Sequence, residues 1–172
     1  MAILDIIVAP DPRLKITAKP VKKVNASVRK LMDDMLATMH SANGIGLAAP
    51  QVGDARRVIV VDVMDEDAEP NPLCMANPEL LWTSDDECVH EEGCLSLPQQ
   101  YAEVSRPDRI RVRYLDHENE IRELETAGVL ATCIQHEMDH LEGVLFVDRL
   151  TPADKLRVRG KLDELEQRYQ RQ

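Results

Sequence analysis

The stretch His136-Glu137-Met138-Asp139-His140 carries more structural information than any other part of this sequence of 172 residues. Two histidines four positions apart lie on one face of a helix, about one turn from each other. A glutamate that directly follows the first histidine can reach a water on a metal ion bound by the two imidazoles. The stretch therefore predicts a helix that holds a metal ion and supports hydrolysis.

The residues around this stretch favour a buried helix over a solvated polar one. Four apolar side chains precede it, namely Val129, Leu130, Cys133 and Ile134. Gly143 follows Glu142, and we expect the helix to run from Thr126 or Gly128 to that glutamate. Buried imidazoles and carboxylates need polar partners, and a metal ion supplies one.

A third metal ligand is needed, and the residues after the second histidine do not provide it. The metzincin pattern requires a histidine where Phe146 stands, and phenylalanine binds no metal. Glu164 and Glu166 belong to a charged terminal helix that we expect at the surface. We therefore look for the third ligand upstream.

Cysteine is the upstream residue type best suited to this role, and the chain has Cys74, Cys88, Cys94 and Cys133. The backbone of Cys133 would lie roughly 10 Å along the helix from that of His140, too far for one ion with bonds of about 2 Å. Cys133 is better placed as a wall residue. Cys94 follows a glycine in a segment expected to be extended, and its thiolate can approach the imidazoles from outside the helix.

The chain resembles the peptide deformylases, because three short motifs of that family occur here in the family's order. They are Gly44-Ile45-Gly46-Leu47-Ala48-Ala49-Pro50-Gln51, Glu92-Gly93-Cys94-Leu95-Ser96 and His136-Glu137-Met138-Asp139-His140. The likeness extends from 12–14 to 150–152. It implies removal of the N-formyl group from the initiator methionine of new polypeptides, with a divalent metal held by Cys94, His136 and His140.

Catalytic roles follow from residue types and from the resemblance. Glu137 is placed to take a proton from water and pass it to the departing amine nitrogen. The resemblance implies that the side-chain amide of Gln51 and the backbone N–H of Leu95 donate to the formyl oxygen. Without it, Gln51 would be read as an ordinary loop residue. Glu92 and Arg106 match a charged pair of the family, although alone they could be surface charges.

The resemblance and the helix geometry together predict a substrate site. Gly44, Ile45 and Gly46 match a strip that pairs with the substrate backbone in the family, whereas glycines just past a helix usually form a cap and turn. Side chains at positions seven, four and three before His136 lie beside the ion; these are Val129, Thr132 and Cys133. With Ile45 they predict a narrow pocket for the methionine thioether. Family members often carry a larger aliphatic residue at Thr132, and some carry an apolar one at His90, so we expect a roomier and more polar pocket.

The sequence leaves alternatives open for both the identity of the metal and the activity. One thiolate and two imidazoles suit Fe2+, Zn2+, Co2+ or Ni2+. We take Fe2+ as the working metal and Zn2+ as the alternative. Three other functions stay open: a His-Glu-x-x-His metallopeptidase, a metal-binding module without catalysis, and a hydrolase in which Cys94 is the nucleophile.

Composition and charge limit the class of protein. The hydrophobic content of 44% and the length predict a single domain over 1–172. The sequence has no 18-residue apolar run and no signal-peptide pattern at its first residues, and its cysteines do not form a disulfide framework, so we expect no membrane association and a cytoplasmic location.

A formal charge of −10 argues against general nucleic-acid binding. A basic cluster at Lys155, Arg157, Arg159 and Lys161 is typically a solvated face, but the resemblance implies docking on the ribosome.

Periodicity predicts an α+β fold in which mostly antiparallel strands surround a central metal-binding helix, with one helix before them and one after. We expect the first helix to begin after Asn25 and Ser27, to carry its apolar stripe over 28–39 and to end near Asn43-Gly44. The last helix is expected over about 151–170, with Val158, Leu162, Leu165 and Tyr169 facing inward. The strand candidates are 58–61, 80–82, 94–97, 102–105, 109–114 and 121–125. The acidic segment 64–72, with two prolines, is expected to be an exposed loop.

Overall fold

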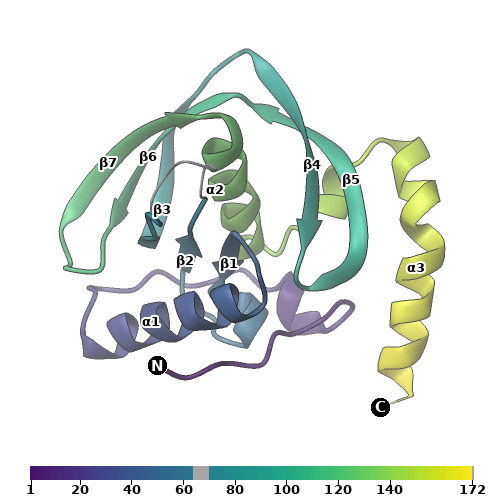
Figure 1. The fold of residues 1–172 in the computed structure, drawn as a ribbon, viewed down its shortest axis with the longest axis horizontal. Helices are drawn as coiled ribbons and strands as arrows, with labels where there is room; N and C mark the ends of the chain where they lie inside the picture. The colour runs from purple at the N-terminus through teal and green to yellow at the C-terminus, as the bar shows by residue number, and fades with distance from the viewer. Residues whose placement is uncertain (64–69, 172) are drawn as a thin grey trace.

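The computed structural model describes residues 1–63 and 70–171, and its architecture is α+β, as the sequence predicts (Figure 1). Five antiparallel strands form one sheet in the order β1-β2-β3-β6-β7. Their bounds are β1 Gly46–Ala48, β2 Val58–Val61, β3 Leu73–Thr83, β6 Arg109–Leu115 and β7 Ile121–Ala127. The other two strands, β4 (Glu87–Cys94) and β5 (Leu97–Pro107), form a separate hairpin. The helices are α1 (Ala26–Ser41), α2 (Gly128–Leu141) and α3 (Pro152–Gln170).

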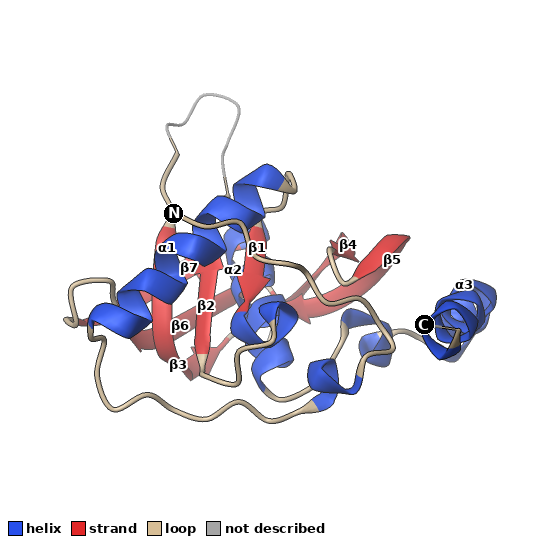
Figure 2. Ribbon diagram, turned by 90° about the horizontal axis from the view of Figure 1, so that it is seen from below, coloured by secondary structure: helices blue, strands red, loops and turns tan. Residues whose placement is uncertain are grey.

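Helix α1 forms where the sequence predicts it and covers one face of the sheet. Asn25 caps it by accepting a hydrogen bond from the Val28 N–H at 3.0 Å. Its buried stripe includes Met32, Met35 and Met39, which are fully enclosed. Figure 2 shows α1 lying across β1 and β2.

Helix α2 packs on the opposite face of the sheet. Successive residues of a strand point to opposite sides, so β2 can contact both helices. In β2, Val58 and Val60 pack in one cluster with α1, while Ile59 and Val61 pack in another with Ile134 of α2. Alternate residues of this apolar run therefore pack against α1 on one face of the sheet and against α2 on the other.

The end of α2 is fixed by Gly143, which adopts a left-handed φ of 74°. A Cβ there would lie 2.5 Å from the Lys15 carbonyl oxygen, so only glycine fits this turn. The helix predicted from Thr126 or Gly128 to Glu142 is confirmed to within one residue at its C-terminus.

The strand predicted at 94–97 is wrong. Cys94 ends β4 and pairs with Leu97 at the start of β5, while Leu95 and Ser96 form the turn between them. The other candidates are confirmed, and several are longer than predicted: 80–82 lies within β3 and 102–105 within β5.

Helix α3 lies on the outer side of the β4–β5 hairpin (Figures 1 and 2). It begins after the Thr151 cap and contacts the rest of the chain through the buried Val158 and Leu165 and the half-buried Leu162. Tyr169 is 41% exposed, so its predicted inward position is wrong, because the helix extends past the core it packs on.

The predicted acidic loop lies partly outside the described residues, which omit 64–69; within the described part, 70–72 are exposed. Among the described residues no helix combines the length and apolarity needed to cross a bilayer.

Candidate metal centre and substrate pocket

Three side chains converge where the β4–β5 turn meets α2. Cys94, His136 and His140 each offer one ligand atom, and these atoms lie within 4.8 Å of one another. The Cys94 Sγ is 3.4 Å from the Nε2 of His140, and the two imidazole rings meet edge to face at 5.1 Å. One thiol and two imidazoles in this arrangement match the donor set of a soft divalent cation.

The electrostatics of the two histidines also fit a cation between them. Burial lowers the pKa of His136, but hydrogen bonding to Cys94 and the nearby carboxylates of Glu137 and Glu92 outweigh burial and raise that pKa to about 10. His140 is 1% exposed, and burial holds its pKa well below the usual value. Its Nδ1 has no hydrogen-bond partner among the described residues. The groups that draw a proton to His136 would equally draw a metal ion.

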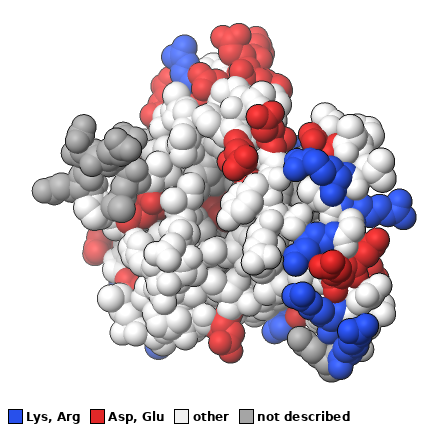
Figure 3. Space-filling model, turned by 45° about the vertical axis from the view of Figure 1, so that its right-hand side comes forward, with Lys and Arg blue, Asp and Glu red and all other residues white. Residues whose placement is uncertain are grey.

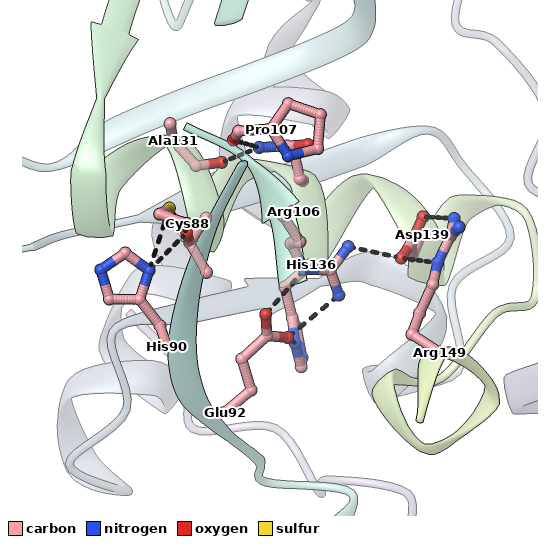
Figure 4. Close-up of polar contacts among 11 residues, drawn as sticks. Cys88, His90, Glu92, Arg106, Pro107, Ala131, His136, Asp139 and Arg149 are labelled. Carbon is pink, nitrogen blue, oxygen red and sulfur yellow. Dashed lines mark hydrogen bonds and ion pairs between the residues drawn. The ribbon is translucent and has the colours of Figure 1, made fainter. Parts of the chain in front are cut away.

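A chain of charged side chains orients His136 (Figure 4). Its Nδ1 is 2.8 Å from the carboxylate of Glu92, so its Nε2 is left to face the cluster. Glu92 in turn accepts two hydrogen bonds from Arg106, at 2.6 and 3.0 Å. Arg106 also donates to Asp139 at 2.9 Å, and Arg149 donates to the same carboxylate.

The Glu92–Arg106 pair is buried, with both side chains 5% exposed, so its reading as a surface pair is wrong. Burial opposes ionisation of Glu92, but hydrogen bonds from His136 and Arg106 hold the pKa of its carboxyl below the usual value. A charged pair at this depth needs close geometry and further partners, and here both members have them.

Glu137 lies beside the cluster and is 2% exposed. Burial raises the pKa of its carboxyl to about 7. Its Oε1 is 3.9 Å from the Nε2 of His140. A Cβ on Gly46 would lie 2.8 Å from the other carboxylate oxygen and 2.8 Å from the Cys133 Sγ, so a residue without a side chain lets β1 approach this carboxylate.

Gln51 is not an ordinary loop residue, because its side chain is 1% exposed and fully engaged. Its Oε1 accepts from the Ala48 N–H at 2.9 Å, which turns its amide nitrogen towards the site. That nitrogen donates to the Ser96 Oγ at 3.1 Å and lies 3.4 Å from the Cys94 Sγ. Leu95 follows Cys94 in the turn between β4 and β5 and lines the cavity described below.

A cavity of about 460 Å³ opens onto this cluster. Its walls include every residue predicted from sequence to bind substrate: Gly44, Ile45, Gly46, Val129, Thr132 and Cys133. Gln51, Leu95, Cys94, His136 and Glu137 line it as well, while His140 lies behind the wall. The Cys133 thiol contacts the Ile45 carbonyl oxygen at 3.5 Å and stands outside the three-residue cluster.

Comparison with known proteins identifies the family. A sequence model of polypeptide deformylases matches residues 3–156. The chain belongs to the polypeptide deformylase family. The peptide deformylase of Methylocella silvestris is 51% identical over 167 residues, which cover 95% of this chain and 85% of the relative. That of Phenylobacterium zucineum is 55% identical over 151 residues, covering 88% and 89% of the two chains.

Solved deformylase structures have the same fold. The crystal structure of the Ehrlichia chaffeensis enzyme matches with a TM-score of 0.89 at 38% identity, covering 96% of this chain and 98% of that one. A plant peptide deformylase matches with a TM-score of 0.93 at 36% identity, covering 98% and 91%. The activity is therefore hydrolytic removal of the N-formyl group from nascent polypeptides, and the family uses a divalent metal. The metallopeptidase alternative is not favoured.

Several wall residues of this deformylase pocket were not predicted from sequence. Tyr101 and Pro98 line the cavity from β5. Tyr101 pairs with Gly93 across the hairpin, so recognition of the turn at Leu95 and Ser96 would have placed it at the site. His90, which the sequence predicts to make the pocket more polar, also lines it.

Proposed function

We propose that this deformylase binds one divalent cation through the Cys94 Sγ, the His136 Nε2 and the Nε2 of His140. Their proximity supports this ligand set, and the contact of the His136 Nδ1 with Glu92 leaves the Nε2 of that ring for the ion. Fe2+ is the proposed metal in the cell, with Zn2+, Co2+ or Ni2+ as substitutes that the same donors accept. When bound, the ion supplies Lewis acidity, which lowers the pKa of a coordinated water from about 15.7 towards about 7.

Glu137 is the proposed proton carrier. It takes a proton from the attacking water and gives it to the amine nitrogen as the formamide C–N bond breaks. The raised pKa of its buried carboxyl supports both roles, because a group that titrates near neutrality accepts and releases a proton with similar ease.

Gln51 and Leu95 are the proposed donors to the formyl oxygen. As the tetrahedral intermediate forms, negative charge develops on that oxygen and needs fixed hydrogen-bond donors. The hydrogen bond from Ala48 holds the Gln51 amide with its nitrogen towards Cys94, which supports a preorganised donor.

The substrate backbone is proposed to extend the sheet at β1. This strand pairs with β2 on one side and is the edge of the sheet on the other. An added strand gains main-chain hydrogen bonds from the Gly44–Ile45–Gly46 strip, and these are independent of the peptide's sequence. The methionine side chain then enters the pocket between Ile45 and the α2 residues Val129, Thr132 and Cys133.

Helix α3 is the proposed contact with the ribosome. Lys155, Arg157 and Arg159 are exposed on it, and Figure 3 shows basic side chains gathered along this helix. The cytoplasm is the proposed location, since the four cysteines are free thiols and the proposed Cys94 ligand requires reducing surroundings.

The observation that carries the proposed mechanism is the convergence of one thiol and two imidazoles beside the buried Glu137. Protein purified without oxygen should hydrolyse formyl-Met-Ala-Ser, leave casein intact and lose activity with a chelator. Cleavage of casein would revive the metallopeptidase. Activity that survives complete metal removal would point to Cys94 as a nucleophile.

A further inference from the structure

Three polar side chains stand together at the wall of the substrate pocket. The His90 Nδ1 is 3.4 Å from the Cys88 Sγ (Figure 4). It is also 3.1 Å from the Thr132 Oγ1. Cys88 and His90 alternate with outward residues of β4, so both face α2, which carries Thr132. His90 and Thr132 both line the cavity.

This trio lies where the end of a substrate side chain would be. Thr132 precedes the proposed ligand His136 by four residues, which corresponds to roughly 6 Å along the helix. A methionine side chain spans a similar length. A substrate whose formyl group is at the metal centre therefore brings the sulfur of its first residue close to Thr132 and His90.

One of the two tautomers of His90 presents a hydrogen-bond donor to the pocket. Among the described residues the Thr132 hydroxyl has no acceptor within hydrogen-bond range other than His90 and Cys88. When it donates to Nδ1, the imidazole proton is on Nε2. No described residue accepts a hydrogen bond from that Nε2, and it is not among the buried unsatisfied atoms. In this tautomer the ring offers an accessible N–H at a wall that is otherwise largely apolar.

We propose that this pocket accepts formyl-methionine sulfoxide as well as formyl-methionine, with His90 as the residue that determines this specificity. The inference rests on the proposed function of the pocket. Oxidation converts the thioether into a strong hydrogen-bond acceptor, which an entirely apolar wall would leave unsatisfied. Here the His90 N–H can donate to the sulfoxide oxygen. The reaction is unchanged: water cleaves the formyl C–N bond, formate and the free amine leave, and the sulfur stays oxidised.

The first test compares substrates on the unmodified holoenzyme. We expect kcat/KM for formyl-Met(sulfoxide)-Ala-Ser to lie within about tenfold of that for formyl-Met-Ala-Ser, for at least one of the two sulfoxide epimers. One epimer should be preferred, because the donor has a fixed position. If both epimers fall more than about 100-fold below formyl-Met, the proposal is overturned. Failure to hydrolyse formyl-Met itself would contradict the proposed function instead.

The second test replaces His90 in the wall of the substrate pocket. His90→Leu should lower the sulfoxide-to-methionine ratio of kcat/KM by about tenfold and reduce the difference between epimers, the loss expected for one hydrogen bond. His90→Gln, which keeps a donor, should retain most of the ratio. His117→Leu is the matched control, because His117 lines a separate surface depression beside Met1 and Asp33. A ratio that is the same in His90→Leu as in the unmodified enzyme would exclude His90 as the determinant, whatever the effect on absolute rates.

Discussion

Cys94 can meet the two histidines only because β4 ends on it, one residue before the chain turns back. The other cysteines are held elsewhere. Cys74 is buried in the core beside α1, where burial raises the pKa of its thiol to about 12. Burial also raises the pKa of Cys133 well above its usual value, with Glu137 adding to the effect. Neither thiol readily becomes the thiolate that binds metal.

Cys94→Ala should therefore lose its metal, whereas Cys74→Ala and Cys133→Ala should keep close to one equivalent. The measurement is metal content per chain after purification without oxygen and exhaustive dialysis. Circular dichroism of each variant controls for folding. Tight retention of one ion by Cys94→Ala would show that the proposed ligand set is wrong.

Glu137→Gln separates proton transfer from metal binding. Glutamine has nearly the same shape and cannot carry the proton, so kcat should fall by about 100-fold or more while metal content stays unchanged. Removing a buried carboxyl with a raised pKa should not reduce thermal stability at neutral pH. Turnover close to that of the unmodified enzyme would exclude Glu137 as the proton carrier.

The helices are better predicted from sequence than the hairpin that completes the site. Helix α2 is largely apolar in its first half and has a glycine just past its end, so its bounds follow from local physics. The turn at Leu95 and Ser96 contains no glycine, asparagine or proline, and its neighbours look like strand residues. Its position is fixed by the pairing of β4 with β5, a tertiary contact that local sequence does not encode.

Because local sequence does not encode strand pairing, only some of the site residues can be predicted from it. The proposed metal ligands, Gln51 and the α2 wall follow from motifs and helix spacing, whereas Tyr101 depends on the hairpin register. The chain from Arg149 through Asp139 to Arg106 also joins three separate elements, and no spacing in the sequence predicts it.

The close approach of β1 to α2 can be tested by a substitution at Gly46. Gly46→Ala places a Cβ against Glu137 and Cys133, so either the strand or the carboxylate must shift. A displacement of about 1 Å at a reacting group can cost about 100-fold, and we expect kcat/KM to fall by at least about tenfold. Overpacking of about 1–3 kcal/mol should also lower Tm by several degrees.

Gly160→Ala is the control for this substitution. Gly160 lies within α3, and a Cβ there meets nothing within 4 Å. Alanine should stabilise the helix by about 0.5–1 kcal/mol and leave kcat/KM unchanged. Equal activity of the two variants would mean that the closeness of β1 and α2 has no part in catalysis.

The negative net charge of the whole molecule opposes the proposed binding of α3 to the ribosome. With a formal net charge of −10, the protein is repelled as a whole by the phosphates of ribosomal RNA. Attraction must therefore come from a local surface that turns towards the RNA. On α3 the basic side chains lie next to acidic ones, and Lys161 pairs with Glu164 at 3.5 Å. Lys155 and Arg159 are exposed and, four residues apart, lie on one helix face.

Lys155→Glu with Arg159→Glu should weaken co-sedimentation with ribosomes and reduce its salt dependence, since each lost phosphate contact lowers the salt slope by nearly one unit. Hydrolysis of the free peptide formyl-Met-Ala-Ser should be unaffected, because α3 lies outside the hairpin and lines no part of the pocket. Lys22→Glu with Lys23→Glu changes the net charge by the same amount at another exposed surface. If both double variants lose ribosome binding equally, net charge governs the association and α3 is not the docking element; loss confined to the α3 variant would assign the contact to that helix face.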